Sequence, residues 1–355
     1  MRVLITGGCG FIGSAVVRHG IRLAGATILN IDKLTYASMP QALEDVEASG
    51  RYHLRRNDIC DPKALETAFS DFAPDAVMHL AAESHVDRSI DSPSAFIQTN
   101  ILGTYTVLEA ARSYWMKLSP TAKRRFRFHH VSTDEVYGSL SIEAPMSAED
   151  APYRPRSPYS ASKASADHLV RAWNETFGLP VLVTNCSNNY GPWQFPEKLI
   201  PVMITKALRQ EQLPIYGKGL NVRDWLHVED HARALWDVLA KGRAGETYNI
   251  GGGAERRNID VVQTICRLMD ERFPQRGPHD RLIRFVQDRP GHDLRYAIDA
   301  GKLQAELGWE PSVDFDSGLG ATVDWYLRNE AWWQDIEASK GKRQGLLLEP
   351  ERVAD

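Results

Sequence analysis

A glycine-rich loop close to the amino terminus is the feature that most constrains the fold of this chain. The apolar run Val3-Leu4-Ile5-Thr6 has strand character and leads directly into Gly7-Gly8-Cys9-Gly10-Phe11-Ile12-Gly13, after which an amphipathic segment begins. Glycines at 7, 10 and 13 permit a tight turn, a close approach of the backbone to a ligand, and close packing of a helix on a strand. The order of strand, glycine loop and helix predicts a dinucleotide-binding unit, with the helix amino terminus facing an anion.

Short apolar runs then alternate with amphipathic stretches through the first half of the chain. The expected strands are 2–6, 27–31, 76–80, 126–132 and 180–185, and the expected helices are 12–24, 62–71, 94–117 and 159–177. Short, fully apolar strands separated by helices are typical of a parallel sheet that is covered on both faces. We therefore expect an α/β fold: a Rossmann-type doubly wound parallel sheet with a smaller, interleaved C-terminal α/β substrate domain.

The texture of the sequence changes after about residue 190. Loops rich in proline and aromatic residues follow, such as Gly191-Pro192-Trp193-Gln194-Phe195-Pro196, and loops of this kind often carry a ligand pocket. The stretch from His227 to Ile250 again has the pattern of a helix followed by a strand. We expect a first domain over 1–190 with a returning segment at 226–252, a second domain over 191–335, and a polar tail over 336–355.

Charge and hydropathy exclude several classes of protein. The net charge is −4, and the basic residues are scattered, with the densest cluster at Lys123-Arg124-Arg125, so no nucleic-acid partner is expected. No run approaches the ~20 apolar residues of a membrane span, so no membrane partner is expected. The first expected strand begins at residue 2, which leaves no room for a signal peptide and predicts a cytoplasmic location.

The four cysteines are Cys9, Cys60, Cys186 and Cys266, far apart in the sequence and without CxxC spacing. This distribution fits neither a disulfide framework nor a zinc site. We expect reduced cysteines and no metal.

Acidic and apolar residues follow the next expected strands. Asp32 ends the second strand, at the spacing expected for a carboxylate that binds a ribose diol, and its charge would repel a 2′-phosphate, which favours NAD over NADP. Asp58-Ile59, between the expected strands 27–31 and 76–80, is expected to flank the adenine. Leu80-Ala81-Ala82, at the end of the expected strand 76–80, is expected to line the path of the cofactor.

Two further segments carry acid–base chemistry. Tyr159 and Lys163 lie one helical turn apart, so the ammonium is expected to lower the pKa of the phenol and make Tyr159 a base near neutral pH. Thr133, Asp134 and Glu135 directly follow a strand, and adjacent acids there offer a proton donor and a proton acceptor in one place. A hydride transfer needs only one such group, so the pair suggests an elimination in the same pocket. The alternative is an acid pair that only stabilises a helix amino terminus.

These segments together resemble the extended short-chain dehydrogenases/reductases and, within them, the dTDP-glucose 4,6-dehydratases, over about residues 1 to 330. The matching segments are TGGCGFIG from Thr6, NIDKLTYA from Asn30, LAAESHVDRS from Leu80, VSTDEVYG from Val131, YSASKASADH from Tyr159, NCSNNYGP from Asn185, FPEKLIP from Phe195, LPIYGKG from Leu213, RDWLHVEDHARAL from Arg223 and DRPGHDLRYAID from Asp288. The chain departs from the pattern of this family at Trp193-Gln194, Leu220-Asn221 and Leu294.

The resemblance implies a reaction and a role for each residue. Tyr159, aided by Lys163 and Thr133, would take the proton of the sugar 4-hydroxyl while NAD takes the C4 hydride. Glu135 would then remove the C5 proton, Asp134 would protonate the departing 6-hydroxyl, the hydride would return to C6 and a proton would return to C5. In the similar epimerases, as the resemblance implies, small or uncharged residues stand at the positions of the acid pair. The implied pathway is dTDP-rhamnose biosynthesis.

The resemblance also implies two sets of binding residues. The NAD-binding set is Gly7, Gly10, Phe11, Ile12, Gly13, Asp32, Lys33, Leu34, Thr35, Asp58, Ile59, Leu80, Ala81, Ala82, Thr99, Tyr159, Lys163 and Asn188. The set for the nucleotide sugar, dTDP-glucose, is Ser84, His85, Thr133, Glu135, Asn189, Lys198, Leu199, Pro214, Tyr216, Arg223, Asn258, Arg289, His292 and Tyr296.

Extended members of this family usually pair two long helices per subunit, so we expect a homodimer through 94–117 and 159–177, with Tyr105, Leu108 and Trp115 on that face. Two other functions stay open at this point. One is a dehydratase or epimerase of a UDP- or GDP-linked sugar, and the other is a non-catalytic NAD-binding protein.

Overall fold

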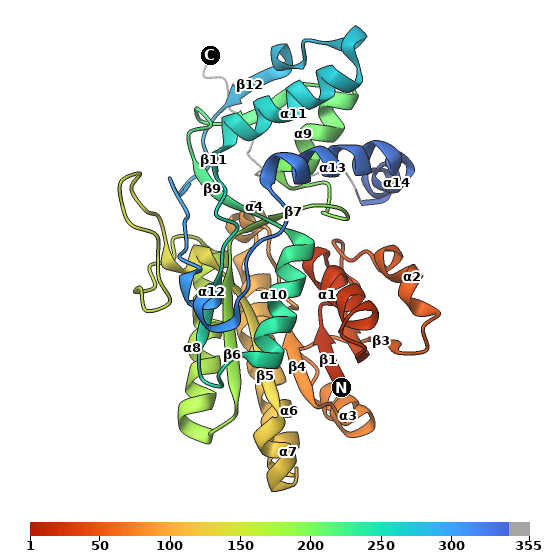
Figure 1. Cartoon of the computed structure of the whole chain (residues 1–355), viewed down its shortest axis with the longest axis vertical. Helices are drawn as coiled ribbons and strands as arrows, with labels where there is room; N and C mark the ends of the chain where they lie inside the picture. Colours follow the sequence, from red (N-terminus) through yellow and green to blue (C-terminus); the bar gives the residue numbers. More distant parts are fainter. Residues whose placement is uncertain (341–355) are drawn as a thin grey trace, which may run out of the picture.

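The computed structural model describes residues 1–340 of the chain. Its larger part is a seven-stranded sheet in the order β10-β6-β5-β4-β1-β2-β3, in which all neighbours pair parallel (Figure 1). The strands are β1 (Arg2–Thr6), β2 (Thr27–Asp32), β3 (Tyr52–Arg56), β4 (Ala76–His79), β5 (Arg127–Thr133), β6 (Val181–Cys186) and β10 (Thr247–Ile250). The chain reverses its direction of winding between β1 and β4, which is where doubly wound sheets bind their ligands.

Helices cover both faces of this sheet. One face packs against α3 (Pro62–Phe72), α6 (Thr104–Met116) and α8 (Pro158–Phe177), and the other against α1 (Phe11–Arg22), α10 (Val228–Lys241) and α12 (Gly301–Leu307). Shorter helices connect them: α2 (Glu44–Glu47), α4 (Val86–Asp91), α5 (Pro93–Phe96) and α7 (Pro120–Arg125), with 3-10 turns η1 (Pro40–Leu43) and η3 (Asp134–Tyr137). The predicted α/β class and doubly wound parallel sheet are confirmed.

The smaller part lies beyond the carboxyl ends of the strands, at the top of Figure 1. It holds a three-stranded sheet of β7 (Asn188–Tyr190), β9 (Val222–His227) and β11 (Glu255–Arg257), and a parallel pair of β8 (Leu213–Tyr216) and β12 (Ile283–Val286). Its helices are α9 (Leu199–Leu208), α11 (Asn258–Arg272), α13 (Phe315–Arg328) and α14 (Glu330–Lys340), and its turns are η4 (Pro274–Arg276) and η5 (His279–Leu282). A hydrophobic core of its own joins α9, α11 and α13.

The chain crosses between the two parts more often than the sequence predicted. The expected return at 226–252 is present as α10 and β10, and β10 extends the large sheet beside β6. A second return was not predicted: α12 and Trp309 pack into the core of the larger part. The expected boundary at residue 190 falls after β7, although β7 pairs with β9 of the smaller part.

Two predicted segments differ in detail. The expected helix 94–117 is α5, a π-helical stretch η2 (Ile97–Gly103) and α6 in succession. The expected polar tail from residue 336 begins inside α14, where Glu337 is buried and paired with Arg209, and its remainder, 341–355, lies outside the described residues. Within residues 1–340, no helix combines the length and apolar character that crossing a membrane requires.

Candidate active site

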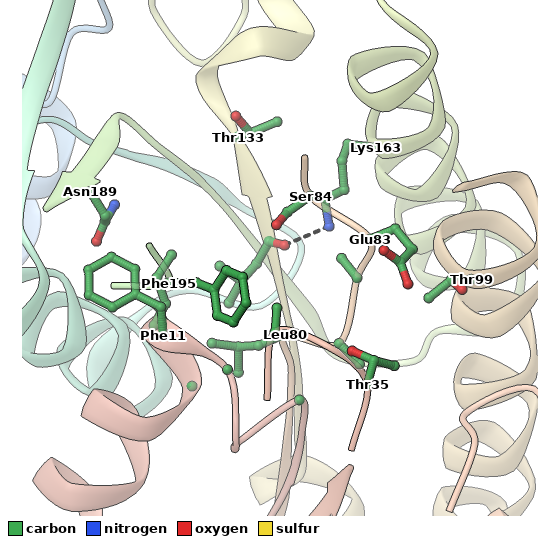
Figure 2. Close-up of a pocket in the computed structure, with 18 of the residues that line it drawn as sticks. Phe11, Thr35, Leu80, Glu83, Ser84, Thr99, Thr133, Lys163, Asn189 and Phe195 are labelled. Atoms are coloured by element: carbon green, nitrogen blue, oxygen red, sulfur yellow. Dashed lines mark hydrogen bonds between the residues drawn. The ribbon is translucent and has the colours of Figure 1, made fainter. Parts of the chain in front are cut away.

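A cavity of about 330 Å³ crosses the sheet at the carboxyl ends of β1, β2, β4, β5 and β6 (Figure 2). Every predicted NAD-binding residue except Leu34 lines it, and so do all five predicted catalytic residues. Leu34 instead lines a neighbouring hollow together with Lys33 and Asp58. Residues far apart in the sequence meet here because parallel strands bring their carboxyl ends to one edge of the sheet.

The glycine loop has the shape of a phosphate cradle. Gly7 has φ +75°, and a Cβ on it would lie 2.7 Å from the backbone of Ala81. A Cβ on Gly13 would lie 2.1 Å from the carbonyl oxygen of Gly7. Gly10 caps α1 without a side chain, so the first N–H groups of that helix are open to a ligand. Only glycine fits at positions 7 and 13, and the bare helix end suits a pyrophosphate.

Asp32 completes a dinucleotide site. Its carboxylate accepts hydrogen bonds from the N–H groups of Cys9 (2.9 Å) and Leu34 (2.8 Å) and from the hydroxyl of Ser38 (3.0 Å), and it lines the cavity. These donors fix an anionic carboxylate where the resemblance places the adenosine ribose. The fixed negative charge fits a ribose diol and disfavours a 2′-phosphate, so the residues present fit NAD.

Tyr159 and Lys163 enter the cavity from α8, which starts at the capping box formed by Ser157 and Ser160. The Lys163 ammonium donates to the carbonyl oxygen of Val131 at 2.8 Å, which is the dashed line in Figure 2. Burial, then the charge of Glu135, raises the pKa of Tyr159 well above its usual value, and the hydrogen bond with Thr133 opposes that rise. The expectation of a lowered pKa for this phenol is therefore not met: burial and the charge of Glu135 raise the pKa of Tyr159, and the Lys163 ammonium donates its hydrogen bond to β5.

The acid pair stands in different surroundings although its members are neighbours in sequence. Asp134 is fully buried, and burial followed by the charges of Glu135 and Asp224 raises its pKa well above the usual range. Burial also raises the pKa of Glu135, but the positive charges of Arg289, Arg223 and Lys198 all oppose that rise. Asp134 thus holds its proton more tightly than Glu135, whose ionised form the three cations favour. Such a division suits one acid and one base.

The predicted sugar-binding residues form two groups. Ser84, Thr133, Glu135, Asn189 and Lys198 line the cavity. The residues outside its lining are His85, Leu199, Pro214, Tyr216, Arg223, Asn258, Arg289, His292 and Tyr296.

Several of this second group are linked to the cavity from the smaller part. Arg289 pairs with Asp87 at 3.3 Å, and the hydroxyl of Tyr216 donates to the same carboxylate at 3.2 Å. The Arg223 guanidinium lies 4.3 Å from the centre of the Tyr296 ring. The charges of both arginines act on the pKa of Glu135, so both lie near this residue of the cavity lining. Leu199 and Asn258 begin α9 and α11, and Pro214 lies in β8.

Sequence reasoning missed two carboxylates in the cavity wall, Glu83 and Glu197. Glu197 accepts from the hydroxyl of Tyr36 at 2.9 Å and lies 3.3 Å from the Arg88 guanidinium, so it ties the loop after β2 to α4. Both lie inside matched segments, beside the predicted Ser84 and Lys198. That adjacency was the available signal.

A Rossmann sheet whose dinucleotide cleft ends at a Tyr-x-x-x-Lys helix beside a strand-end threonine defines the class of extended short-chain dehydrogenases/reductases. The family model described as GDP-mannose 4,6 dehydratase matches residues 4–322. The chain belongs to this family.

Individual relatives agree with this assignment. A dTDP-glucose 4,6-dehydratase of Salmonella typhimurium is 58% identical over 95% of this chain and 96% of its own. The solved dTDP-glucose 4,6-dehydratase of Streptomyces venezuelae, with NAD bound, shares 44% identity over 95% of this chain and all of its own, with a TM-score of 0.86. A UDP-glucose 4-epimerase of Thermotoga maritima has the same fold, with a TM-score of 0.82, over 93% of this chain and all of its own, but only 28% identity.

Proposed function

We propose that this chain is an NAD-dependent dTDP-glucose 4,6-dehydratase, a hydro-lyase that forms dTDP-4-keto-6-deoxy-glucose and water. The carrying observation is that Asp134, which is buried, and Glu135, which is partly buried, line the same cavity as Tyr159 and Lys163. An epimerase or a binding protein has no use for a protonated acid and an ionisable one beside the hydride site. Relatives that are 58% and 59% identical to this chain carry the name dTDP-glucose 4,6-dehydratase, which supports the same choice.

The glycine loop and Asp32 would hold NAD, which would supply the hydride acceptor for sugar C4 and the hydride donor for C6. Tyr159 takes the proton of the 4-hydroxyl, with Thr133 in hydrogen-bond contact and Lys163 supplying positive charge. The resulting 4-ketone acidifies C5. Glu135 takes the C5 proton, and Asp134 gives its proton to the departing 6-hydroxyl, which leaves as water. A proton returns to C5 when the hydride returns to C6.

The nucleotide part of the substrate is assigned to the smaller part of the molecule. Lys198, Arg223 and Arg289 bring three positive charges to the cavity end that holds Glu135, as a diphosphate requires. Residues 1–190 with 226–252 then hold the cofactor, and residues 191–335 hold the nucleotide sugar. We assign the enzyme to the cytoplasm and its product to dTDP-rhamnose biosynthesis, as the resemblance implies.

The function is tested by incubating the purified protein, without added NAD, with dTDP-glucose and following the sugar nucleotide by mass spectrometry. Loss of one water is expected, because a cofactor that is regenerated in each turnover stays bound. UDP-glucose and GDP-mannose in parallel reactions are the controls for the base. An unchanged mass with dTDP-glucose, both with and without added NAD, would refute the proposal.

We also propose a homodimer through residues 94–117, which form α5, η2 and α6, and through α8. Ring contacts join Tyr105 to Trp173 at 5.9 Å and Trp173 to Phe177 at 5.5 Å, and Leu102 (47%), Tyr105 (46%) and Phe177 (43%) are exposed. Leu108, expected on this face, is instead fully buried in the core. Sedimentation should show a dimer that Leu102→Asp dissociates and Met146→Asp, a change at an exposed residue elsewhere, does not. A monomeric wild type would refute it.

A further inference from the structure

A buried polar network lies behind Lys163, and the proposed chemistry does not use it. Asp167 follows Lys163 by one turn of α8 and has no exposed surface. Its Oδ2 accepts hydrogen bonds from the hydroxyls of Ser132 at 2.9 Å and Tyr153 at 2.8 Å. Tyr153 in turn accepts from Arg171 at 2.7 Å, so the far end of the network is cationic.

The other oxygen of Asp167 faces the catalytic lysine. Asp167 Oδ1 lies 3.1 Å from His130 Nε2, and His130 Nε2 lies 3.5 Å from Lys163 Nζ. Among the described residues, no donor meets Oδ1 with hydrogen-bond geometry. A fully buried carboxylate oxygen without a hydrogen bond is costly, unless a positive charge compensates it. Lys163 is the nearby charge on that side.

The charges of the network favour this pairing. Burial lowers the pKa of Lys163, and the charge of Asp167 is the first force that opposes the fall. Burial lowers the pKa of His130 to about 4, with Lys163 adding to the fall, so this imidazole is neutral near neutral pH. Burial would raise the pKa of Asp167, but contacts with His130, Lys163 and Ser132 outweigh it and lower the pKa. Asp167 is therefore the anion of the network.

We propose that Asp167 is a positioning residue that keeps Lys163 protonated beside Tyr159, acting across the neutral imidazole of His130. The inference rests on the proposed function, because it gives Lys163 the task of supplying positive charge to the phenol. The polar and titratable groups that face the pair are Arg171 and Tyr159 on α8, His130 and Ser132 on β5, Asn185 and Cys186 on β6, His79 on β4, and Tyr153.

The test is the pH profile of kcat for water loss from dTDP-glucose. Asp167→Asn keeps the size of the side chain and removes its charge, so Lys163 should lose its proton at lower pH. The alkaline limb of the profile should move down by about one pH unit or more, since an opposite charge at this range shifts a pKa by that amount. KM should change little, while Asp167→Glu should restore part of the limb.

Asp230→Asn is the matched control. Asp230 is also buried (2% exposed) and accepts from Ser312 and Val313, but it contacts neither Lys163 nor the cavity. This variant should lower thermal stability and leave the pH profile unchanged. If Asp167→Asn does not fold, Asp167→Ser replaces it, with the same direction of shift expected, because this variant also removes the charge.

An active Asp167→Asn or Asp167→Ser enzyme whose alkaline limb coincides with that of the wild type would overturn the inference alone. A wild-type protein inactive on dTDP-glucose would instead overturn the proposed function, and with it this inference.

Discussion

At the scale of single residues, the chemistry depends on what surrounds Asp134 and Glu135. The sequence could predict that adjacent acids after a strand offer a donor and an acceptor. It could not say which is which, because Asp224, Arg223 and Arg289 reach the pair from distant parts of the chain. The same limit explains the misjudged pKa of Tyr159: helical spacing predicts that Lys163 is near, but not that burial and the charge of Glu135 raise the pKa of the phenol.

Replacing Tyr159 by phenylalanine tests the proton acceptor. Tyr159→Phe should lower kcat by about 10²-fold or more, because the 4-hydroxyl proton loses its acceptor. The variant should still purify with NAD, since the glycine loop and Asp32 are untouched; the measurement is turnover together with the bound nucleotide. Tyr248→Phe removes a phenol that contacts Arg243 and Glu306 and should remain active. Near-normal turnover of Tyr159→Phe would exclude the assigned role.

At the scale of helices and strands, the local sequence pattern was sufficient to predict the strands of the large sheet. It was not sufficient to predict where the chain crosses between the two parts. Apolar runs and glycine loops follow from local periodicity, so β1, β2, β4, β5 and β6 were predicted within a residue or two of their observed ends. The return of α12 depends on Leu303 and Trp309 packing into the core of the larger part. That contact is long-range and leaves no periodic signal in a helix of only Gly301–Leu307.

A substitution at the contact between α1 and α10 tests the return of the chain to the larger part at α10. A Cβ on Gly20 of α1 would lie 2.2 Å from Cζ2 of Trp236 on α10. Gly20→Ala should therefore lower the free energy of unfolding by about 1–3 kcal/mol through overpacking, despite the better helix propensity of alanine. In Gly320→Ala, on α13, the new methyl group meets only Arg272 at 4.0 Å and should be neutral or stabilising in the same denaturant titration. Equal stabilities for the two variants would contradict this packing.

At the scale of the whole molecule, the site exists only because the two parts interleave. The larger part supplies the glycine loop, Tyr159 and the acid pair, and the smaller part supplies Lys198, Arg223 and Arg289. The sequence could list most of these residues from their motifs. Which of them line the cavity is settled by side-chain packing between the parts.

Buried histidines should make the fold acid-sensitive. Burial lowers the pKa of His129 and of His231 from 6.5 to about 3. The unfolded chain takes up these protons near pH 6.5, so stability is lost as the pH falls from there towards 3, by about 2 kcal/mol per histidine at pH 5. The midpoint of thermal unfolding should fall between pH 7 and pH 5, and His129→Gln should reduce that fall. An equal fall in the variant would show that His129 takes no part.

The most direct test of the account is a single turnover of the double variant Asp134→Asn/Glu135→Gln on dTDP-glucose, followed by absorbance of the reduced nicotinamide and by the mass of the sugar nucleotide. Tyr159 and Lys163 are intact in this variant, so oxidation at C4 is expected to proceed and the reduced cofactor to accumulate. The mass of the sugar should show no loss of water, because neither the acid nor the base of the elimination remains. Loss of water at the wild-type rate would contradict the assignment of the acid pair.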